Sequence, residues 1–214
     1  MLGSSMKSMI FDIDGTLWDS RALVAEGYNI QLNAEGYSQL CVDAEVLRPL
    51  FGKTMTEIAD VILASVPAQE RYGLMERCMD TENKYLAENE CKIGYLGVKE
   101  TLEALKKDYR LFIVSNAQCG YPELCMQKLD IAHLFEGHLC FGDTGTEKGE
   151  TILTLMRRHH ITDALYIGDT QGDYEATLVA KIPFIFAAYG FGDPKGFAAK
   201  LEDIRQLPEI LKTL

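Results

Sequence analysis

The sequence contains few basic residues. Its 21 Lys and Arg residues stand against 32 Asp and Glu, which gives a formal net charge of −11 at pH 7. No run of Lys and Arg is longer than two residues. A general nucleic-acid-binding surface needs basic groups that neutralise the phosphates, so we expect no nucleic-acid partner. A small anionic ligand held by a few local charges remains compatible with this composition.

Closely spaced cysteine pairs and long apolar segments are also missing. The six cysteines include no C-x-x-C pair, so neither a zinc site nor a redox dithiol has its usual spacing. We expect reduced thiols in a cytoplasmic protein. No uncharged apolar stretch is long enough to cross a bilayer, and the apolar segment 9–13 is interrupted by Asp12 and Asp14 and does not resemble a secretory signal. We therefore expect no membrane partner.

Short apolar segments alternate with helix-like segments along much of the chain. Segments rich in β-forming residues predict buried strands over 8–13, 111–114, 138–141, 164–167 and 183–188. Between the later ones, the pattern predicts helices over 98–107, 123–129, 146–159 and 173–179. Continuous apolar strands that alternate with helices indicate an α/β fold with a Rossmann-like parallel sheet covered on both faces.

The stretch from about residue 20 to residue 90 has helical periodicity and no convincing strand. Turn signals at Arg48-Pro49, Phe51-Gly52 and Val66-Pro67 divide it into three or four helices, enough for a small bundle. We expect a core domain made of residues 1–18 and 91–214, and a helical cap domain made of residues 19–90. In open α/β sheets, ligands bind at the carboxyl ends of the strands, so the chemistry is expected from Asp12 onward.

The first predicted strand ends in two carboxylates, Asp12 and Asp14, followed by Gly15 and Thr16. The two-residue period of a strand sends both carboxylates to the same side. Two negative charges so close are stable together only with a cation between them, and oxygen ligands suit Mg²⁺. Gly15 allows a sharp turn and leaves its N–H open to an anion, while Thr16 adds a hydroxyl. Alone, the pattern also fits a polar turn with solvated aspartates.

Polar residues follow three later strands in the same way: Ser115 and Asn116, then Lys148, then the acidic pair Asp169 and Asp173. Each has an ordinary explanation by itself, as turn chemistry, a solvated lysine or a helix cap. Lys148 lies near a helix start, where the helix dipole disfavours a cation, unless its ammonium points back toward the carboxylates. Since all four elements end strands of one parallel sheet, we predict that they meet at one site.

These residues resemble the four motifs of the haloacid dehalogenase-like hydrolases. The motifs read Asp12-x-Asp14-Gly15-Thr16, Ser115-Asn116, Lys148, and Gly168-Asp169-Thr170-x-x-Asp173. The core resemblance covers about residues 7–18 and 92–189. The helical stretch matches, in position and character, the cap of the phosphoglycolate-phosphatase-like and β-phosphoglucomutase-like members. The motifs are specific for the superfamily and carry little information on the substrate.

The resemblance implies a reaction. Asp12 attacks phosphorus and forms an aspartyl-phosphate, and Asp14 protonates the leaving alcohol and then activates water. Mg²⁺ is the implied cofactor, held by Asp12, the backbone carbonyl of Asp14, and Asp169, with Asp173 as a ligand or an outer support.

Further residues are implied to bind the substrate. Ser115 and Lys148 offset charge on the phosphoryl oxygens, and Gly15, Thr16 and Asn116 surround the phosphate. Lys53 lies in a segment that resembles the specificity loop of the relatives, although a solvated loop lysine is an equally good reading. We expect a small phosphorylated metabolite as the partner, and both a monomer and a homodimer remain open.

Several alternatives remain. A phosphomutase of the β-phosphoglucomutase type keeps the same core motifs, although the cap offers no clear second phosphate clamp. A non-catalytic member that binds a phosphorylated ligand or a protein is less favoured, because every catalytic residue type is present. The second carboxylate, Asp14, disfavours dehalogenase and phosphonate-cleaving activity. Phosphoglycolate, a sugar phosphate, a nucleotide and a phosphorylated amino-alcohol all remain possible substrates.

Overall fold

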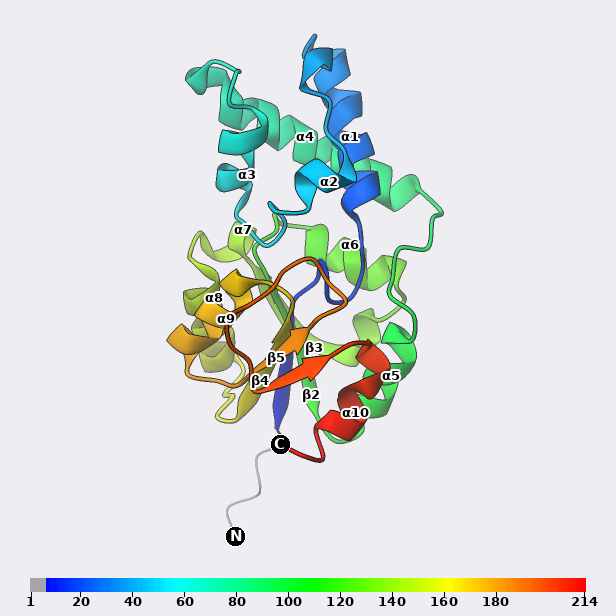
Figure 1. The fold of residues 1–214 in the computed structure, drawn as a ribbon, viewed down its shortest axis with the longest axis vertical. Helices are drawn as coiled ribbons and strands as arrows, with labels where there is room; N and C mark the ends of the chain where they lie inside the picture. Colours follow the sequence, from blue (N-terminus) through cyan, green and yellow to red (C-terminus); the bar gives the residue numbers. More distant parts are fainter. Residues whose placement is uncertain (1–6) are drawn as a thin grey trace. The chain divides into compact units, whose positions relative to one another are not determined.

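The computed structural model describes residues 7–214, which form two compact units (Figure 1). The core unit comprises the described residues up to Asp19 together with Gly94–Leu214, and the helical unit comprises Ser20–Ile93. The sequence placed the two boundaries after residues 18 and 90, whereas the units divide after residues 19 and 93.

The core unit is built on a parallel sheet of six strands in the order β3-β2-β1-β4-β5-β6. Its strands are β1 (Ser8–Phe11), β2 (Arg110–Ser115), β3 (Phe135–Cys140), β4 (Ala164–Gly168), β5 (Phe184–Ala187) and β6 (Ala199–Leu201). The central strands β1 and β4 are buried along their whole length, which explains why they are continuous apolar segments. The predicted α/β core with a parallel sheet is confirmed.

The two edge strands differ from the sequence prediction. β3 begins at Phe135, three residues before the predicted start, and ends at Cys140, because Phe141 opens a short helix. β6 was not predicted at all. Both strands lie at an edge of the sheet and expose part of their surface. They therefore lack the continuous apolar pattern by which the inner strands were recognised.

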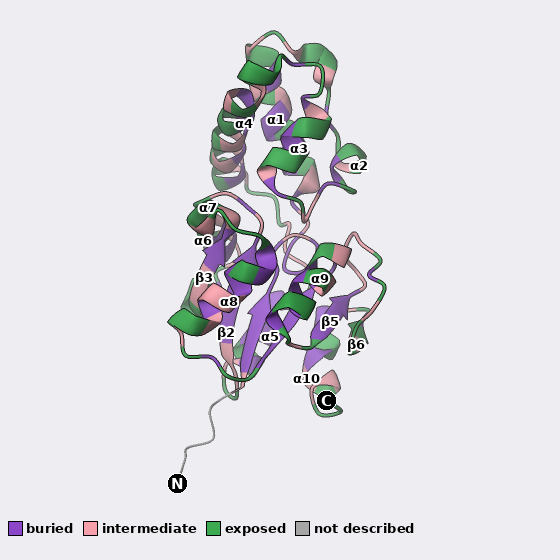
Figure 2. Cartoon of the chain, turned by 90° about the vertical axis from the view of Figure 1, so that its left-hand side faces the viewer, coloured by how far each residue is buried: buried purple, intermediate pink, exposed green. Residues whose placement is uncertain are grey.

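The helices of the core unit lie on both sides of the sheet (Figure 1). They are α5 (Val98–Leu105), α6 (Tyr121–Lys128), α7 (Phe141–Thr144), α8 (Lys148–Arg158), α9 (Gln171–Ala180) and α10 (Leu207–Ile210), with the short 3-10 turns η2 (Ala132–Leu134) and η3 (Ile204–Gln206). Helices α8 and α9 pack against each other and against the sheet. Alternate strand residues such as Ile10, Phe112 and Tyr166 meet Ile152 and Leu155 of α8 in one buried cluster. The inner strands β1, β4 and β5 are buried along their whole length (Figure 2).

The helical unit contains four α-helices among its described residues. They are α1 (Arg21–Ala34), α2 (Ala44–Leu47), α3 (Met55–Ile62) and α4 (Ala68–Glu88), with the 3-10 turn η1 (Ser38–Leu40) between α1 and α2. Helices α1 and α4 pack closely together. A Cβ atom at Gly27 would lie 2.8 Å from the Cα atom of Glu82, so this glycine lets the two backbones approach.

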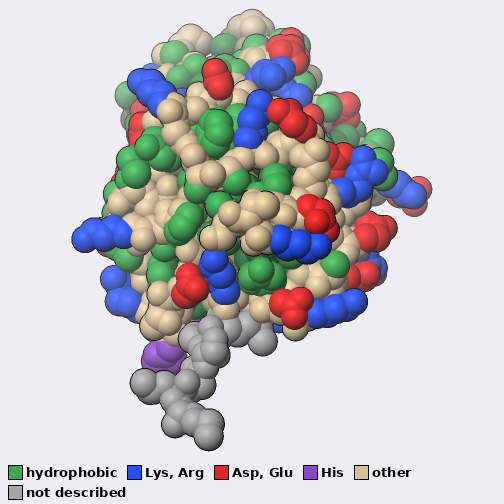
Figure 3. Space-filling view, turned by 60° about the horizontal axis from the view of Figure 1, so that its bottom comes forward, with side chains coloured by type: hydrophobic (Ala, Val, Ile, Leu, Met, Phe, Trp, Pro, Cys, Tyr) green, Lys and Arg blue, Asp and Glu red, His purple; other side chains and the backbone are tan. Residues whose placement is uncertain are grey.

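The described helices and the face shown in Figure 3 were expected to lack a membrane span and a basic patch. None of the described helices combines the length and the apolar character needed to cross a bilayer. On the face shown in Figure 3, Lys and Arg side chains are interspersed with Asp and Glu. The described residues of this face form no continuous basic patch, in agreement with the negative net charge.

Helix α3 begins with a capping box at Thr54. The Thr54 hydroxyl accepts the N–H of Glu57, and the Glu57 carboxylate accepts the N–H of Thr54 at 2.8 Å. We expect Thr54→Ala to lower the free energy of unfolding of the helical unit by about 1 kcal/mol, measured by urea denaturation. Ser65→Ala, at an exposed position outside any helix, is the control and should change stability little. Equal effects of the two changes would contradict the capping role.

Candidate active site

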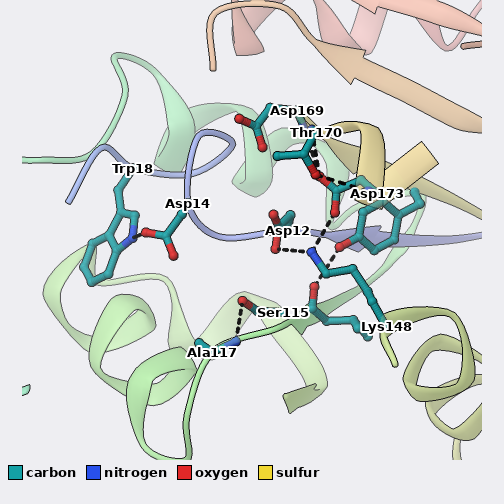
Figure 4. A network of polar contacts seen from close by, with 11 residues as sticks. Asp12, Asp14, Trp18, Ser115, Ala117, Lys148, Asp169, Thr170 and Asp173 are labelled. Carbon is teal, nitrogen blue, oxygen red and sulfur yellow. Dashed lines mark hydrogen bonds and ion pairs between the residues drawn. The ribbon is translucent and has the colours of Figure 1, made fainter. Parts of the chain in front are cut away.

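Asp12 directly follows β1 and lies at the centre of a buried polar cluster (Figure 4). Only 2% of the residue is exposed, and its N–H continues the sheet by donating to the carbonyl of Ile167 at 2.8 Å. Its Oδ1 atom lies 3.1 Å from the Nζ atom of Lys148, the first residue of α8. The ammonium of Lys148 therefore points back toward the end of β1.

Asp173 is the second carboxylate that Lys148 contacts. Lys148 Nζ donates to Asp173 Oδ1 at 2.6 Å. The other oxygen, Oδ2, accepts the N–H groups of Asp169 and Thr170 and the Thr170 hydroxyl, at 2.7 to 3.1 Å. Asp173 thus completes the capping box of Thr170 at the start of α9, in line with the helix-cap explanation, and it also pairs with the lysine.

Asp169 directly follows β4 and is fully buried. Its Oδ2 atom accepts the N–H of Phe191 at 2.7 Å. The segment around Phe191 follows β5, and it comes this close because Gly190 has no side chain: a Cβ atom there would lie 2.4 Å from both Asp169 Cβ and the carbonyl oxygen of Gly15. Sequence reasoning gave this segment no role, although a Gly-x-Gly pattern at the carboxyl end of a strand is a usable signal.

The carboxylates of Asp12, Asp169 and Asp173 form a group able to hold a cation. One oxygen from each lies within 4.8 Å of the other two. Asp169 Oδ1 is buried and has no hydrogen-bond partner among the described residues, which is costly for a carboxylate oxygen without a cation. The ligand set consists of oxygen atoms only, as hard ions such as Mg²⁺ prefer. The residues therefore fit a divalent cation.

The charges of this cluster lead to the same conclusion. Three buried carboxylates face a single buried ammonium. Burial, followed by the charge of Asp173, raises the pKa of Asp12 to about 7. Burial and the two neighbouring carboxylates raise the pKa of Asp169 well above its usual value. Burial alone would lower the pKa of Lys148, but Asp12 and Asp173 outweigh it and raise that pKa. Without a cation, the cluster holds more negative charge than it can stabilise.

Asp14 lies apart from these three carboxylates, and Figure 4 shows it directed toward Trp18. Asp14 Oδ1 accepts the indole N–H of Trp18 at 2.7 Å and the hydroxyl of Tyr121 at 2.8 Å. The rings of Trp18 and Tyr121 meet edge to face at 5.4 Å. The chain leaves the strand at Phe11, so the two-residue period no longer governs Asp14. Sequence reasoning missed Tyr121 because nothing local marks a residue of α6 as a neighbour of Asp14.

The expectation for the backbone of Gly15 was wrong in one respect. Gly15 does make a sharp turn, with φ at 76°, and a Cβ atom there would lie 2.1 Å from Asp169 Oδ2. Its N–H, however, donates to the carbonyl of Trp18 at 2.9 Å and is not open to an anion. This hydrogen bond closes the turn between Gly15 and Trp18.

The Thr16 hydroxyl is buried and has no hydrogen-bond partner among the described residues.

The remaining predicted residues lie in different places. Ser115 is the last residue of β2, and its Oγ atom accepts the N–H of Ala117 at 3.3 Å, so its hydroxyl proton is available to a ligand. Asn116 follows it and is half-buried. Lys53 belongs to the helical unit, where it is exposed and immediately precedes the capping residue Thr54. The roles predicted for these residues stay predictions.

A model of the haloacid dehalogenase-like hydrolases matches residues 9–187, which is most of the chain. The chain belongs to the haloacid dehalogenase-like hydrolase family. The resemblance inferred from the four motifs is thereby confirmed, and the chain is a hydrolase of this family.

Relatives of this hydrolase include phosphoglycolate phosphatases. The chain is 26% identical to the phosphoglycolate phosphatase of Rhodobacter capsulatus over 96% of both chains, and 26% identical to that of Aliivibrio fischeri over 88% of both. Its fold is similar to the crystal structure of a predicted phosphoglycolate phosphatase from Haemophilus somnus, with a TM-score of 0.82, 22% identity, and 98% and 99% of the two chains covered. A 2-haloacid dehalogenase from Pseudomonas syringae shares the fold with a TM-score of 0.66, at 22% identity over 98% and 99% of the two chains.

The raised pKa of Asp12 has a consequence for the stability of the metal-free protein. Because the folded protein holds a proton on Asp12 that the unfolded chain has lost, stability falls as the pH rises from about 4 to about 7 and then levels off. We expect Asp12→Asn to stabilise the metal-free protein at pH 8, by up to about 4 kcal/mol, and by less at pH 5. Thermal unfolding in a chelator at both pH values measures this. An Asp12→Asn variant less stable than the unaltered chain at pH 8 would contradict the charge argument.

Proposed function

We propose that this hydrolase is a magnesium-dependent phosphatase that hydrolyses a small phosphate monoester through an aspartyl-phosphate on Asp12. The observation that carries the proposal is the buried position of Asp12, 3.1 Å from Lys148 and grouped with Asp169 and Asp173. A carboxylate in such surroundings can act as a nucleophile only toward an electrophile whose own negative charge is offset. A phosphoryl group beside a cation and an ammonium meets this requirement.

The proposed reaction has two displacements. An oxygen of Asp12 attacks phosphorus, the bond between phosphorus and the leaving alcohol oxygen breaks, and Asp14 gives its proton to that oxygen. Water then attacks the phosphorus of the aspartyl-phosphate, Asp14 takes the proton of the water, and the bond to Asp12 breaks to release phosphate. Asp14 suits both steps because Trp18 and Tyr121 hold one of its oxygens in place.

The groups around Asp12 stabilise charge in this scheme. Lys148 and the Ser115 hydroxyl offset the charge on the phosphoryl oxygens. Asp12, Asp169 and the backbone carbonyl of Asp14 would hold Mg²⁺, with Asp173 as an outer support through its bond to Lys148. When bound, Mg²⁺ supplies positive charge next to the reacting phosphoryl group. The partnerless oxygen of Asp169 supports its place among these ligands.

The substrate class follows from the relatives and from Asp14. The curated relatives that cover nearly the whole chain are phosphoglycolate phosphatases, so we propose phosphoglycolate as the first substrate to test. The presence of Asp14 favours a phosphatase over a dehalogenase, because only ester cleavage needs a proton donor for the leaving oxygen.

All six cysteines are free thiols, which supports the proposed cytoplasmic location.

We expect Asp12→Asn to lower phosphate release by roughly three orders of magnitude or more, because the amide cannot act as the nucleophile. The assay measures phosphate released from phosphoglycolate and from p-nitrophenyl phosphate in Mg²⁺. Excess chelator should abolish the same activity. Asp108→Asn, which changes an exposed carboxylate outside the four motifs, is the matched control. Full activity in chelator, or in Asp12→Asn, would refute the proposal.

We expect Tyr121→Phe to lower kcat about tenfold, since it removes a hydrogen bond to the Asp14 carboxylate worth about 1.4 kcal/mol. Losing this donor favours the protonated carboxyl group, so the acidic limb of the pH profile of kcat should move to higher pH. Tyr72→Phe is the matched control, because it removes a comparable bond, to Asp60 at 3.0 Å, in the helical unit. A fall in kcat without a moved limb would mean that Tyr121 does not act through Asp14.

A further inference from the structure

The carboxylates of Asp12, Asp169 and Asp173 are called the carboxylate cluster below. A second group of side chains with metal-ligand chemistry lies outside it. It consists of Cys119, Cys140 and Asp143, and one ligand atom from each lies within 4.8 Å of the other two. We call it the thiol cluster. Cys119 follows β2 in the loop before α6, Cys140 is the last residue of β3, and Asp143 belongs to α7. No motif residue is part of it.

The fold explains how these residues meet. Strands β2 and β3 are parallel neighbours, and Ser115 pairs with Cys140 where both strands end. Helix α7 then turns back at once, so that Asp143 Oδ2 accepts the N–H of Cys140 at 2.8 Å. The loop after β2 approaches closely from the other side, because a Cβ atom at Gly142 would lie 2.4 Å from the nitrogen of Cys119.

The two sulfur atoms face different oxygens of one carboxylate. Cys140 Sγ lies 3.1 Å from Asp143 Oδ2, and Cys119 Sγ lies 3.7 Å from Asp143 Oδ1. In a tetrahedral zinc site with bonds of about 2.3 Å to sulfur and about 2.1 Å to oxygen, the ligand atoms are roughly 3.5 to 3.8 Å apart. The two sulfur-to-oxygen distances, 3.1 and 3.7 Å, lie near this spacing, and one ligand atom of each residue lies within 4.8 Å of the other two.

We propose that Cys119, Cys140 and Asp143 form a second metal site, which binds a thiophilic divalent cation such as Zn²⁺ with a fourth position left to water. Two sulfur ligands favour zinc or cadmium over Mg²⁺. Each ion bound releases the two thiol protons to solvent, so the two positive charges gained equal the two lost and the net charge of the site stays the same. The site is distinct from the oxygen-only group of Asp12, Asp169 and Asp173.

Helix capping alone does not account for this arrangement. Asp143 caps α7 through the N–H of Cys140, which explains the position of one of its oxygens. The other oxygen faces Cys119, a residue of a different loop that takes no part in the cap. A cation between the two thiols and the carboxylate gives all three side chains one function. It would also tie the loop that follows Ser115 to the start of α7.

A disulfide between the two cysteines is the competing explanation. It requires an oxidant, and it joins the two sulfur atoms without involving Asp143. Both sulfur atoms face oxygens of the Asp143 carboxylate. A carboxylate between two thiols is a ligand for a cation and has no part in a disulfide, so the arrangement of the three groups supports a metal site over a disulfide.

Cadmium binding to the full chain tests the proposal. The protein is kept reduced by a phosphine and saturated with Mg²⁺, which occupies the carboxylate cluster, and Cd²⁺ is then added while the ultraviolet thiolate-to-cadmium absorption is recorded. We expect saturation at one Cd²⁺ per chain, with Zn²⁺ displacing the signal. Cys119→Ser should abolish the two-thiolate signal, and Cys41→Ser, at another exposed cysteine, should leave it unchanged.

A second variant separates the ligand role of Asp143 from its capping role. Asp143→Asn keeps an oxygen that can accept the N–H of Cys140, and it removes the charge that binds the ion. We expect at least a tenfold weaker affinity for Cd²⁺ with an unchanged circular dichroism spectrum. Cys119 is exposed, so Cys119→Ser should fold like the unaltered chain, and its spectrum checks this.

Several results would overturn the proposal. They are the absence of a cadmium signal in the unaltered chain, a signal that persists in Cys119→Ser, and equal affinity for Cd²⁺ in Asp143→Asn. A Cys119–Cys140 disulfide found by mass spectrometry after incubation with Zn²⁺ in air would do the same. None of these measurements depends on phosphatase activity, so the two proposals can fail independently.

Discussion

The buried contact between Lys148 and two carboxylates organises the edge of the sheet where the site lies. The ammonium lies 3.1 Å from Asp12 and 2.6 Å from Asp173, and so joins the end of β1 to the start of α9. Burying these charges costs several kcal/mol for each ion unless partners compensate. One ammonium cannot compensate three carboxylates, and the remaining negative charge makes the cluster fit for a cation. Structure and chemistry therefore depend on the same imbalance of charge.

Asp173 shows how closely the structure of the site and its chemistry are connected. One of its oxygens satisfies the backbone at the start of α9, and the other holds Lys148 in place. Asp169 is fixed in a similar way by the N–H of Phe191. These side chains cannot rotate freely, because each is tied to a helix start or to a tight backbone turn. A rigid arrangement of this kind reduces the reorganisation that a charged reaction otherwise requires.

The carboxylate cluster and the thiol cluster lie at strand ends of the same parallel sheet, β1 and β4 for the first and β2 and β3 for the second. In a parallel sheet all carboxyl ends lie at one edge, which gathers side chains from distant parts of the chain. The donor atoms differ, oxygen in one and mainly sulfur in the other, so each group suits a different class of ion. One edge of one sheet can therefore hold two independent sites.

Local patterns were enough to predict the parallel sheet, the helical insert and the residues of the four motifs, because each motif lies near the end of a strand or at the start of a helix. Asp12, Lys148 and Asp169 could be chosen in this way without knowing their distances. The edge strand β6, the partners Tyr121 and Phe191, and the thiol cluster could not, since their neighbours are far away in the chain and no short-range period marks them. The cysteine spacing even argued against a zinc site, although the loop after β2 brings Cys119 close to Cys140 at the end of β3.

The sequence by itself determined which chemical groups stand at strand ends, because hydrophobic periodicity is a local property. Only the tertiary structure decided which of those groups touch, and that the N–H of Gly15 is used within its own turn, because contacts depend on how strands pair and loops pack.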